Sequence, residues 1–154
     1  MRILFLCTDN YTRSVIAEFC LINYIQTKHI NGIEVASAGF NSNSDISKFS
    51  NVHFKRMNEL GIDTSNFVRN QFREQFFQEF DVIIAMGKEH KEYVKQNFGR
   101  TISLFNEVYK NEVSSLVVPP PDKKGYKNEI KNMVDYINDA VPMLLEKVKD
   151  ETVH

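Results

Sequence analysis

Four short apolar runs recur along the chain and predict four β-strands. They are residues 2–7 (RILFLC), 32–39 (GIEVASAG), 81–86 (DVIIAM) and 101–105 (TISLF). The first run is apolar almost without a break, which is typical of a strand that is buried on both faces. These runs therefore predict a sheet whose inner strands have no contact with solvent.

Segments with apolar residues at helical spacing lie between and after these runs and predict helices. They are residues 13–27, 52–61, 88–98 and 129–149, with a shorter helical or irregular aromatic segment at 70–80. Gly61 and Gly99 stand at the ends of two of them, as glycine often does at helix C-termini. Pro142 falls inside the last helix and is expected to kink it, because an interior proline removes a backbone hydrogen bond.

The alternation of strand and helix predicts βαβ units. Such units build a parallel sheet with helices on both faces, and residues 1–154 are long enough for one domain of this kind. Segments 41–51 and 114–128 are rich in Asn, Ser or Pro and are expected to be loops. In open α/β sheets, ligands bind at the carboxyl ends of the strands. The loop 7–13, which follows the first strand, is therefore the expected binding position.

Composition excludes several classes of function. The net charge is −1, so the chain has no bulk basicity for nucleic acid or a membrane surface, and no apolar run approaches the length of a membrane span. Two cysteines in 154 residues do not make a disulfide framework, which favours a reducing compartment, and we expect the cytoplasm. The four histidines have no metal-like spacing, and no role is assigned to them.

The loop 7–13 combines a cysteine, an arginine and the start of a helix. Backbone N–H groups of such a loop can face one concavity and hold an oxyanion, and the helix N-terminus adds further donors. The donors that hold phosphate also stabilise a thiolate at Cys7, and the planar guanidinium of Arg13 matches two oxygens of a tetrahedral anion. Ser14 can donate to the thiolate. These residues predict covalent phosphoryl transfer through Cys7.

The spacing of Cys7 and Arg13 is weak support by itself, because such a pair occurs often by chance. Its place between a buried strand and a helix makes the catalytic interpretation the better one. Cys20 has a different setting, on the apolar face of the helix predicted at 13–27. It is interpreted as a small core residue.

Several segments resemble the low-molecular-weight protein tyrosine phosphatases. LFLCTDNYTRSVIAEF (4–19) is similar to the opening of that family, whose loop reads C-x-G-N-x-C-R-S-P. VASAG (35–39), LGIDTSNFVRNQF (60–72) and FDVIIAMGKEH (80–90) are similar to its second strand and middle section. The resemblance covers nearly the whole chain. It implies a single-domain, flavodoxin-like, four-stranded parallel sheet without metal or organic cofactor.

The resemblance also implies roles for loop residues. Cys7 corresponds to the nucleophile, Arg13 to the phosphate clamp, Asn10 to the asparagine that organises the loop backbone and Ser14 to the partner of the thiolate. The residues expected to bind substrate or phosphate are Thr8, Asp9, Asn10, Tyr11, Thr12, Arg13, Ser14 and Phe40.

The loop departs from the family pattern at two of these positions. Asp9 replaces a glycine, and its carboxylate would oppose a phosphate dianion unless it points outward. Thr12 replaces a second cysteine, which removes the thiol that can trap Cys7 in a disulfide. Tyr11 and Phe40 are expected to stack on an aromatic substrate or to wall the pocket.

The general acid of the family is an aspartate before a proline in a loop near the C-terminus. Direct alignment places Pro120 there, and Asp122 is the only carboxylate in the loop VVPPPDKKGY. We therefore predict Asp122 as the acid, although a solvated turn residue is the alternative. Lys123 and Lys124 replace an aromatic pair and would favour an acidic peptide or a highly charged phosphoester.

The resulting hypothesis is a phosphomonoester hydrolase, predicted to be a protein tyrosine phosphatase. Its substrate would be a phosphotyrosine protein or a small aryl phosphate, and bacterial relatives suggest a tyrosine kinase as partner. One alternative is a non-catalytic or weakly active relative that binds anions or a protein partner. An arsenate reductase is the less favoured alternative, because no cysteine follows Cys20 to relay a disulfide.

Overall fold

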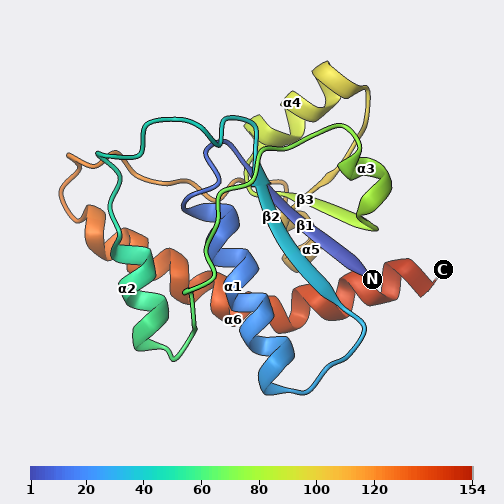
Figure 1. The fold of residues 1–154 in the computed structure, drawn as a ribbon, viewed down its shortest axis with the longest axis horizontal. Helices are drawn as coiled ribbons and strands as arrows, with labels where there is room; N and C mark the ends of the chain where they lie inside the picture. Colours follow the sequence, from blue (N-terminus) through green and yellow to red (C-terminus); the bar gives the residue numbers. More distant parts are fainter. Residues whose placement is uncertain (154) are drawn as a thin grey trace.

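The structure, a computed structural model, describes residues 1–153 and contains a parallel four-stranded sheet in the order β2-β1-β3-β4 (Figure 1). The strands are β1 (Arg2–Cys7), β2 (Glu34–Gly39), β3 (Val82–Ala85) and β4 (Ser103–Leu104). Residues Ile3 to Leu6 of the inner strand β1 have no exposed surface. Strand β1 pairs with β2 from Arg2↔Glu34 to Cys7↔Gly39, so both strands end at the same edge.

Helices cover both faces of the sheet. They are α1 (Arg13–Thr27), α2 (Val52–Glu59), α3 (Phe76–Glu79), α4 (Lys88–Phe98), α5 (Phe105–Lys110) and α6 (Tyr126–Val153). On one face, α1, α5 and α6 pack over Ile3 and Phe5, and α2 packs against α6. On the other face, Phe76 of α3 and Val94 of α4 cover Leu4 and Leu6. The predicted α/β fold with helices on both faces is confirmed.

The fourth strand differs from the sequence prediction. Residues 101–105 were expected to form it, but β4 has only two residues and Phe105 already begins the helix α5, which was not predicted. Glu107 explains the early turn into helix, since its carboxylate accepts a hydrogen bond of 3.0 Å from the N–H of Leu104. Such a bond satisfies an N–H group that the helix itself leaves unpaired.

The structure also defines the extent of two other predicted segments. In the segment 70–80 only α3 is helical, and residue Gln71 instead forms a parallel bridge with Gly39 at the end of β2. Helix α6 begins three residues before the predicted start, and it continues on both sides of Pro142, so the proline does not end the helix. Gly61 and Gly99 adopt positive φ angles of 80° and 66° after α2 and α4, as expected of glycine at helix ends.

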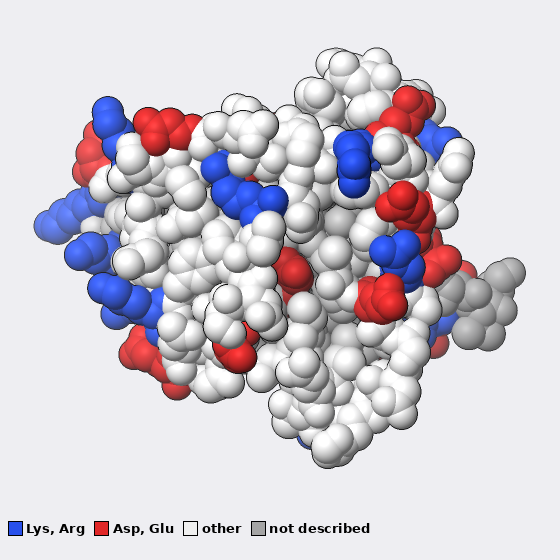
Figure 2. Space-filling model, in the orientation of Figure 1, with Lys and Arg blue, Asp and Glu red and all other residues white. Residues whose placement is uncertain are grey.

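On the face in Figure 2, most charged side chains lie around the edge. Several basic ones lie close together at the left, basic and acidic ones are mixed at the right, and the middle of this face is mostly uncharged. None of the helices in the described part of the chain has the length and apolar character needed to cross a membrane.

Candidate active site

The loop from Cys7 to Arg13 connects β1 to α1 at the carboxyl edge of the sheet, where the sequence placed it. It lies directly against the end of β2, because the N–H of Asn41 donates to the Thr8 carbonyl over 2.8 Å. A Cβ atom on Gly39 would lie 2.5 Å from the Thr8 carbonyl oxygen and 2.7 Å from the Asn10 nitrogen. Only glycine allows this close approach of strand and loop.

Asn10 fixes the shape of the loop. The residue is fully buried and has a left-handed φ of 53°, a conformation that asparagine tolerates better than most residues. Its side-chain oxygen accepts a 2.7 Å hydrogen bond from the backbone N–H of Asn70. Its side-chain nitrogen donates to the hydroxyl groups of Ser14, over 3.0 Å, and Ser37, over 2.8 Å.

These bonds decide which way the neighbouring hydroxyl groups point. The Sγ atom of Cys7 and the Oγ atom of Ser14 are 2.8 Å apart. Ser14 Oγ accepts a hydrogen from Asn10, and its own hydrogen is free to point toward the sulfur of Cys7. A donated hydrogen stabilises a thiolate, which is the nucleophilic form of cysteine.

The network continues from Asn10 to a partly buried carboxyl group. Ser37 Oγ accepts from Asn10 and donates to the Oε1 atom of Glu18 over 2.6 Å. Burial raises the pKa of Glu18 to about 7, and the hydrogen bond from Ser37 opposes this rise. A hydrogen-bonded chain thus joins Cys7 to Glu18 through Ser14, Asn10 and Ser37, and sequence analysis had assigned no role to Glu18 or Ser37.

Arg13 is held on the opposite side of the loop by groups that are distant in sequence. Its Nη1 atom donates to Oε1 of Glu89 over 2.7 Å and to the Leu116 carbonyl over 3.0 Å. The side chain is only 15% exposed, so these bonds fix the guanidinium rather than leave it in solvent. Burial raises the pKa of Glu89, but its hydrogen bonds, including the one from Arg13, outweigh this effect and lower it. One edge of the guanidinium is thereby anchored.

His90 supports the loop from the start of α4. Its Nδ1 atom accepts from the Gly87 N–H over 3.0 Å, so the neutral ring carries its hydrogen on Nε2, which lies 3.0 Å from the Thr8 hydroxyl. Burial and the neighbouring Arg13 lower the pKa of His90 to about 4, which keeps the ring neutral near pH 7. Sequence analysis missed Glu89 and His90. Both residues follow β3 at the edge of the sheet that carries Cys7, and this position could have identified them as candidate site residues.

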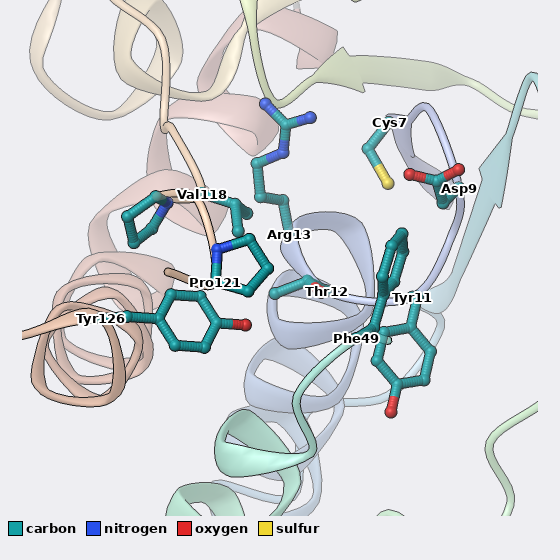
Figure 3. Close-up of a pocket in the computed structure, with 10 residues that line it drawn as sticks. Cys7, Asp9, Tyr11, Thr12, Arg13, Phe49, Val118, Pro121 and Tyr126 are labelled. Atoms are coloured by element: carbon teal, nitrogen blue, oxygen red, sulfur yellow. The ribbon is translucent and has the colours of Figure 1, made fainter. Parts of the chain in front are cut away.

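Asp9 lines the pocket together with Cys7 (Figure 3). Its Oδ1 atom accepts a 2.7 Å hydrogen bond from Ser44. The backbone carbonyl of Asp9 accepts two bonds from Arg69, at 3.0 and 2.8 Å, and Arg69 also donates to the Ser44 hydroxyl over 2.7 Å. Arg69 therefore holds both the loop and the residue that orients the Asp9 carboxylate.

These elements enclose a pocket of about 140 Å³. It is lined by Cys7, Asp9, Tyr11, Thr12, Arg13, Phe49, Val118, Pro119, Pro121 and Tyr126. Four of the predicted binding residues, Asp9, Tyr11, Thr12 and Arg13, are among them together with the predicted nucleophile Cys7, whereas Thr8, Asn10 and Ser14 do not line the pocket. The ring of Tyr11 packs edge-on against His53, with ring centroids 5.0 Å apart, and lies 5.6 Å from the ring of Phe49.

The structure does not bring two of the predicted residues to this pocket. Asp122 is exposed on the turn before α6, and its assignment as the acid stays a prediction that requires this turn to move. Phe40 stacks on Tyr93 with ring centroids 3.8 Å apart, away from the pocket lining. Lys123 pairs with Glu129 over 3.0 Å. Pro119, which is buried, lines the pocket together with exposed Pro121 and half-buried Tyr126, where an aspartate was expected.

The other cysteine has no part in this pocket. Cys20 is fully buried in the apolar core that includes α1 and α6. Burial raises the pKa of its thiol to about 12, with a smaller contribution from Asp135. Among the described residues, no group of three or more His, Cys, Asp or Glu side chains is arranged to hold a metal ion.

Comparisons with known proteins agree with this geometry. A family model described as low molecular weight phosphotyrosine protein phosphatase matches residues 2–154. Sequence comparison with curated proteins gave no match.

Several solved structures resemble the chain over nearly its full length. A YwlE mutant from Bacillus subtilis is 26% identical with a TM-score of 0.79, and the alignment covers 97% of this chain and 99% of that one. A second structure is a YwlE arginine phosphatase variant with a phosphorylated active-site serine in place of cysteine. It is 25% identical, with a TM-score of 0.79 and coverage of 97% and 96%.

A low molecular weight protein tyrosine phosphatase from T. tengcongensis is 25% identical, with a TM-score of 0.78 and coverage of 96% of this chain and 99% of that one. The family match and these structures support a phosphatase. The pocket floored by Cys7 and the match over residues 2–154 lead to one conclusion: the chain belongs to the low molecular weight phosphotyrosine protein phosphatase family.

Proposed function

We propose that residues 1–154 act as one phosphatase domain that hydrolyses phosphotyrosine through a cysteinyl-phosphate intermediate. The observation that carries this proposal is the 2.8 Å contact between Cys7 and Ser14, at a pocket that Arg13 also lines. The hydroxyl of Ser14 is within reach to donate a hydrogen bond to the sulfur when Cys7 attacks or leaves as a thiolate.

In the first step, the Cys7 sulfur attacks phosphorus while the Arg13 guanidinium and the loop N–H groups hold the phosphate oxygens. These donors stabilise the charge of the transition state. In the second step, water attacks the phosphocysteine and Cys7 leaves as a thiolate, which Ser14 stabilises. Arg13 needs no reorganisation, because Glu89 and the Leu116 carbonyl already fix its position.

The walls of the pocket support an aromatic leaving group. Tyr11, Phe49 and Tyr126 contribute aromatic rings, and two prolines add rigid apolar surface. Burial and the neighbouring Tyr126 raise the pKa of Tyr11, so its phenol is neutral near pH 7 and does not repel a phosphate. A phenyl ring attached to the phosphate would pack between these groups.

A phosphoarginine protein is the second candidate substrate. Asp9 places a carboxylate in the pocket lining, where it is complementary to a guanidinium group. The YwlE structures that resemble this chain include one described as an arginine phosphatase. Asp9 is therefore the residue whose charge separates the two substrate classes.

Hydrolysis of p-nitrophenyl phosphate by the wild type and by Cys7→Ser tests the reaction. We expect turnover that vanadate inhibits and that Cys7→Ser abolishes. A wild type that binds inorganic phosphate without turnover would support the non-catalytic alternative instead. Peptides of one sequence with either phosphotyrosine or phosphoarginine then decide between the substrates, and the preferred peptide is the one with the higher kcat/KM.

The cellular role remains a proposal. We expect the protein to act in the cytoplasm on a phosphoprotein, with a bacterial tyrosine kinase as a partner. The arsenate reductase alternative is disfavoured by the position of Cys20 in the apolar core, because a disulfide relay requires an accessible second thiol.

A further inference from the structure

His53 is a buried histidine that contacts the loop 7–13 from outside the pocket. It is the second residue of α2 and is only 1% exposed. Its Nε2 atom lies 2.8 Å from the backbone carbonyl oxygen of Tyr11. The centroid of its ring lies 5.0 Å from that of Tyr11 and 4.1 Å from that of Phe54. Tyr11 lines the pocket and His53 does not, so any effect of His53 on a bound phosphate passes through the loop.

The hydrogen bond between His53 and Tyr11 has a single direction. A carbonyl oxygen can only accept, so the Nε2 atom of His53 carries the hydrogen. Burial lowers the pKa of His53 to about 4, and the bond to Tyr11 opposes this change. The ring is therefore neutral near pH 7, and it donates to the Tyr11 carbonyl without bringing a charge to the loop.

This bond fixes the peptide group between Tyr11 and Thr12. In a planar trans peptide, the C=O and N–H bonds point in opposite directions. Because the Tyr11 carbonyl points toward His53, the N–H group of Thr12 points away from it. That N–H group donates to no other described residue, and Thr12 lines the pocket. A donor next to the pocket is thus left free for a ligand.

We propose that His53 is a positioning residue for the phosphatase reaction, which holds the Tyr11 carbonyl away from the substrate so that the Thr12 N–H donates to a phosphate oxygen. This role rests on the proposed phosphatase function. Without the bond from His53, the peptide group could rotate, and the negative end of its carbonyl would then oppose the phosphate. Arg69 holds the Asp9 carbonyl in the same manner, so side chains from outside the loop direct two of its peptide groups.

Two substitutions of His53 separate its hydrogen bond from the packing of its ring. His53→Phe keeps a ring against Tyr11 and Phe54 and removes the donor, whereas His53→Gln removes the ring and keeps an N–H donor. We expect His53→Phe to lower kcat/KM for p-nitrophenyl phosphate at least about tenfold, because a displaced donor stabilises the transition state less. His53→Gln should retain most of the wild-type kcat/KM.

The amide proton of Thr12 provides a readout that packing alone would not change. In proton–nitrogen correlation NMR spectra, inorganic phosphate should shift this signal in the wild type and in His53→Gln. The shift should be lost in His53→Phe, and well-dispersed spectra would show that the variants are folded. If phosphate shifts other loop amides of the wild type but not that of Thr12, the proposal is overturned, whether or not the variants fold.

The remaining outcomes also decide the question. Wild-type activity of His53→Phe, with or without a loss in His53→Gln, would mean that His53 only packs against its neighbours, and this overturns the proposal. If both variants lose activity, a Thr12 shift retained in His53→Phe overturns the proposal and a shift lost there supports it. A wild type that neither hydrolyses p-nitrophenyl phosphate nor shows a phosphate-induced shift of any loop amide overturns the phosphatase function itself.

Discussion

Replacement of Glu18 by Gln should change how the stability of this protein depends on pH. The Glu18 carboxyl is largely buried and accepts one hydrogen bond, from Ser37. A glutamine has nearly the same shape, and its side-chain oxygen can accept the same bond. The substitution therefore removes the ionisation of this group and keeps the network that leads to Cys7.

The magnitude follows from the pKa of Glu18, which burial raises from 4.5 to about 7. A carboxyl with a higher pKa in the folded state binds its proton more tightly there than in the unfolded chain. Its contribution to stability is fully present below about pH 4.5 and is lost as the pH rises through about 7. The difference between the two pKa values corresponds to about 3 kcal/mol.

Urea unfolding of the wild type and Glu18→Gln at about pH 5 and about pH 8 measures this difference. We expect the free energy of unfolding of Glu18→Gln, relative to the wild type, to be higher at the alkaline pH by up to about 3 kcal/mol. Glu74→Gln, at an exposed position, is the matched control and should follow the wild type at both pH values. Parallel pH profiles for the wild type and Glu18→Gln would refute the reasoning.

Three other substitutions test the loop. Gly39→Ala should lower kcat/KM at least about tenfold, measured on p-nitrophenyl phosphate, because the new Cβ would meet the Thr8 carbonyl and displace the loop. Asn10→Gly loses the side-chain hydrogen bonds but still adopts the left-handed φ easily. Asn10→Ala loses the same bonds and is also strained at this φ. Urea unfolding should therefore find Asn10→Ala less stable than Asn10→Gly by about 1 kcal/mol. Equal stability of these two variants would contradict a role for the backbone conformation. Ser14→Ala should lower kcat more than it changes KM, and it should slow alkylation of Cys7 by iodoacetate, because the thiolate loses its donor.

Several features of the fold were determined by short stretches of sequence. The apolar run at 2–7 and the helical spacing at 13–27 gave β1 and α1 with the observed bounds. Gly61 and Gly99 marked helix ends. These features could be predicted because each depends on residues a few positions apart. The position of Cys7 at the carboxyl edge followed from the same local patterns, since all parallel strands end at one side of the sheet.

The contacts that shape the pocket were decided by tertiary structure. Arg13 is fixed by Glu89 and the Leu116 carbonyl, which lie 76 and 103 positions further along the chain. Asp9 is oriented through Arg69, 60 positions away. Hydrophobic periodicity places residues on a face of an element but says nothing about which distant side chain meets them, because that depends on how the elements pack.

The proline-rich loop before α6 shows the same difference between what the sequence predicted and what the tertiary structure decided. The sequence alone predicted an anion-binding cysteine loop after β1, and it suggested Asp122 as an acid because this is the only carboxylate in its loop. Only the packed structure put Pro119, Pro121 and Tyr126 against the pocket and left Asp122 in solvent. A loop with several prolines has no period from which the direction of a side chain can be inferred, so contacts with the rest of the protein determine which of its residues face the pocket.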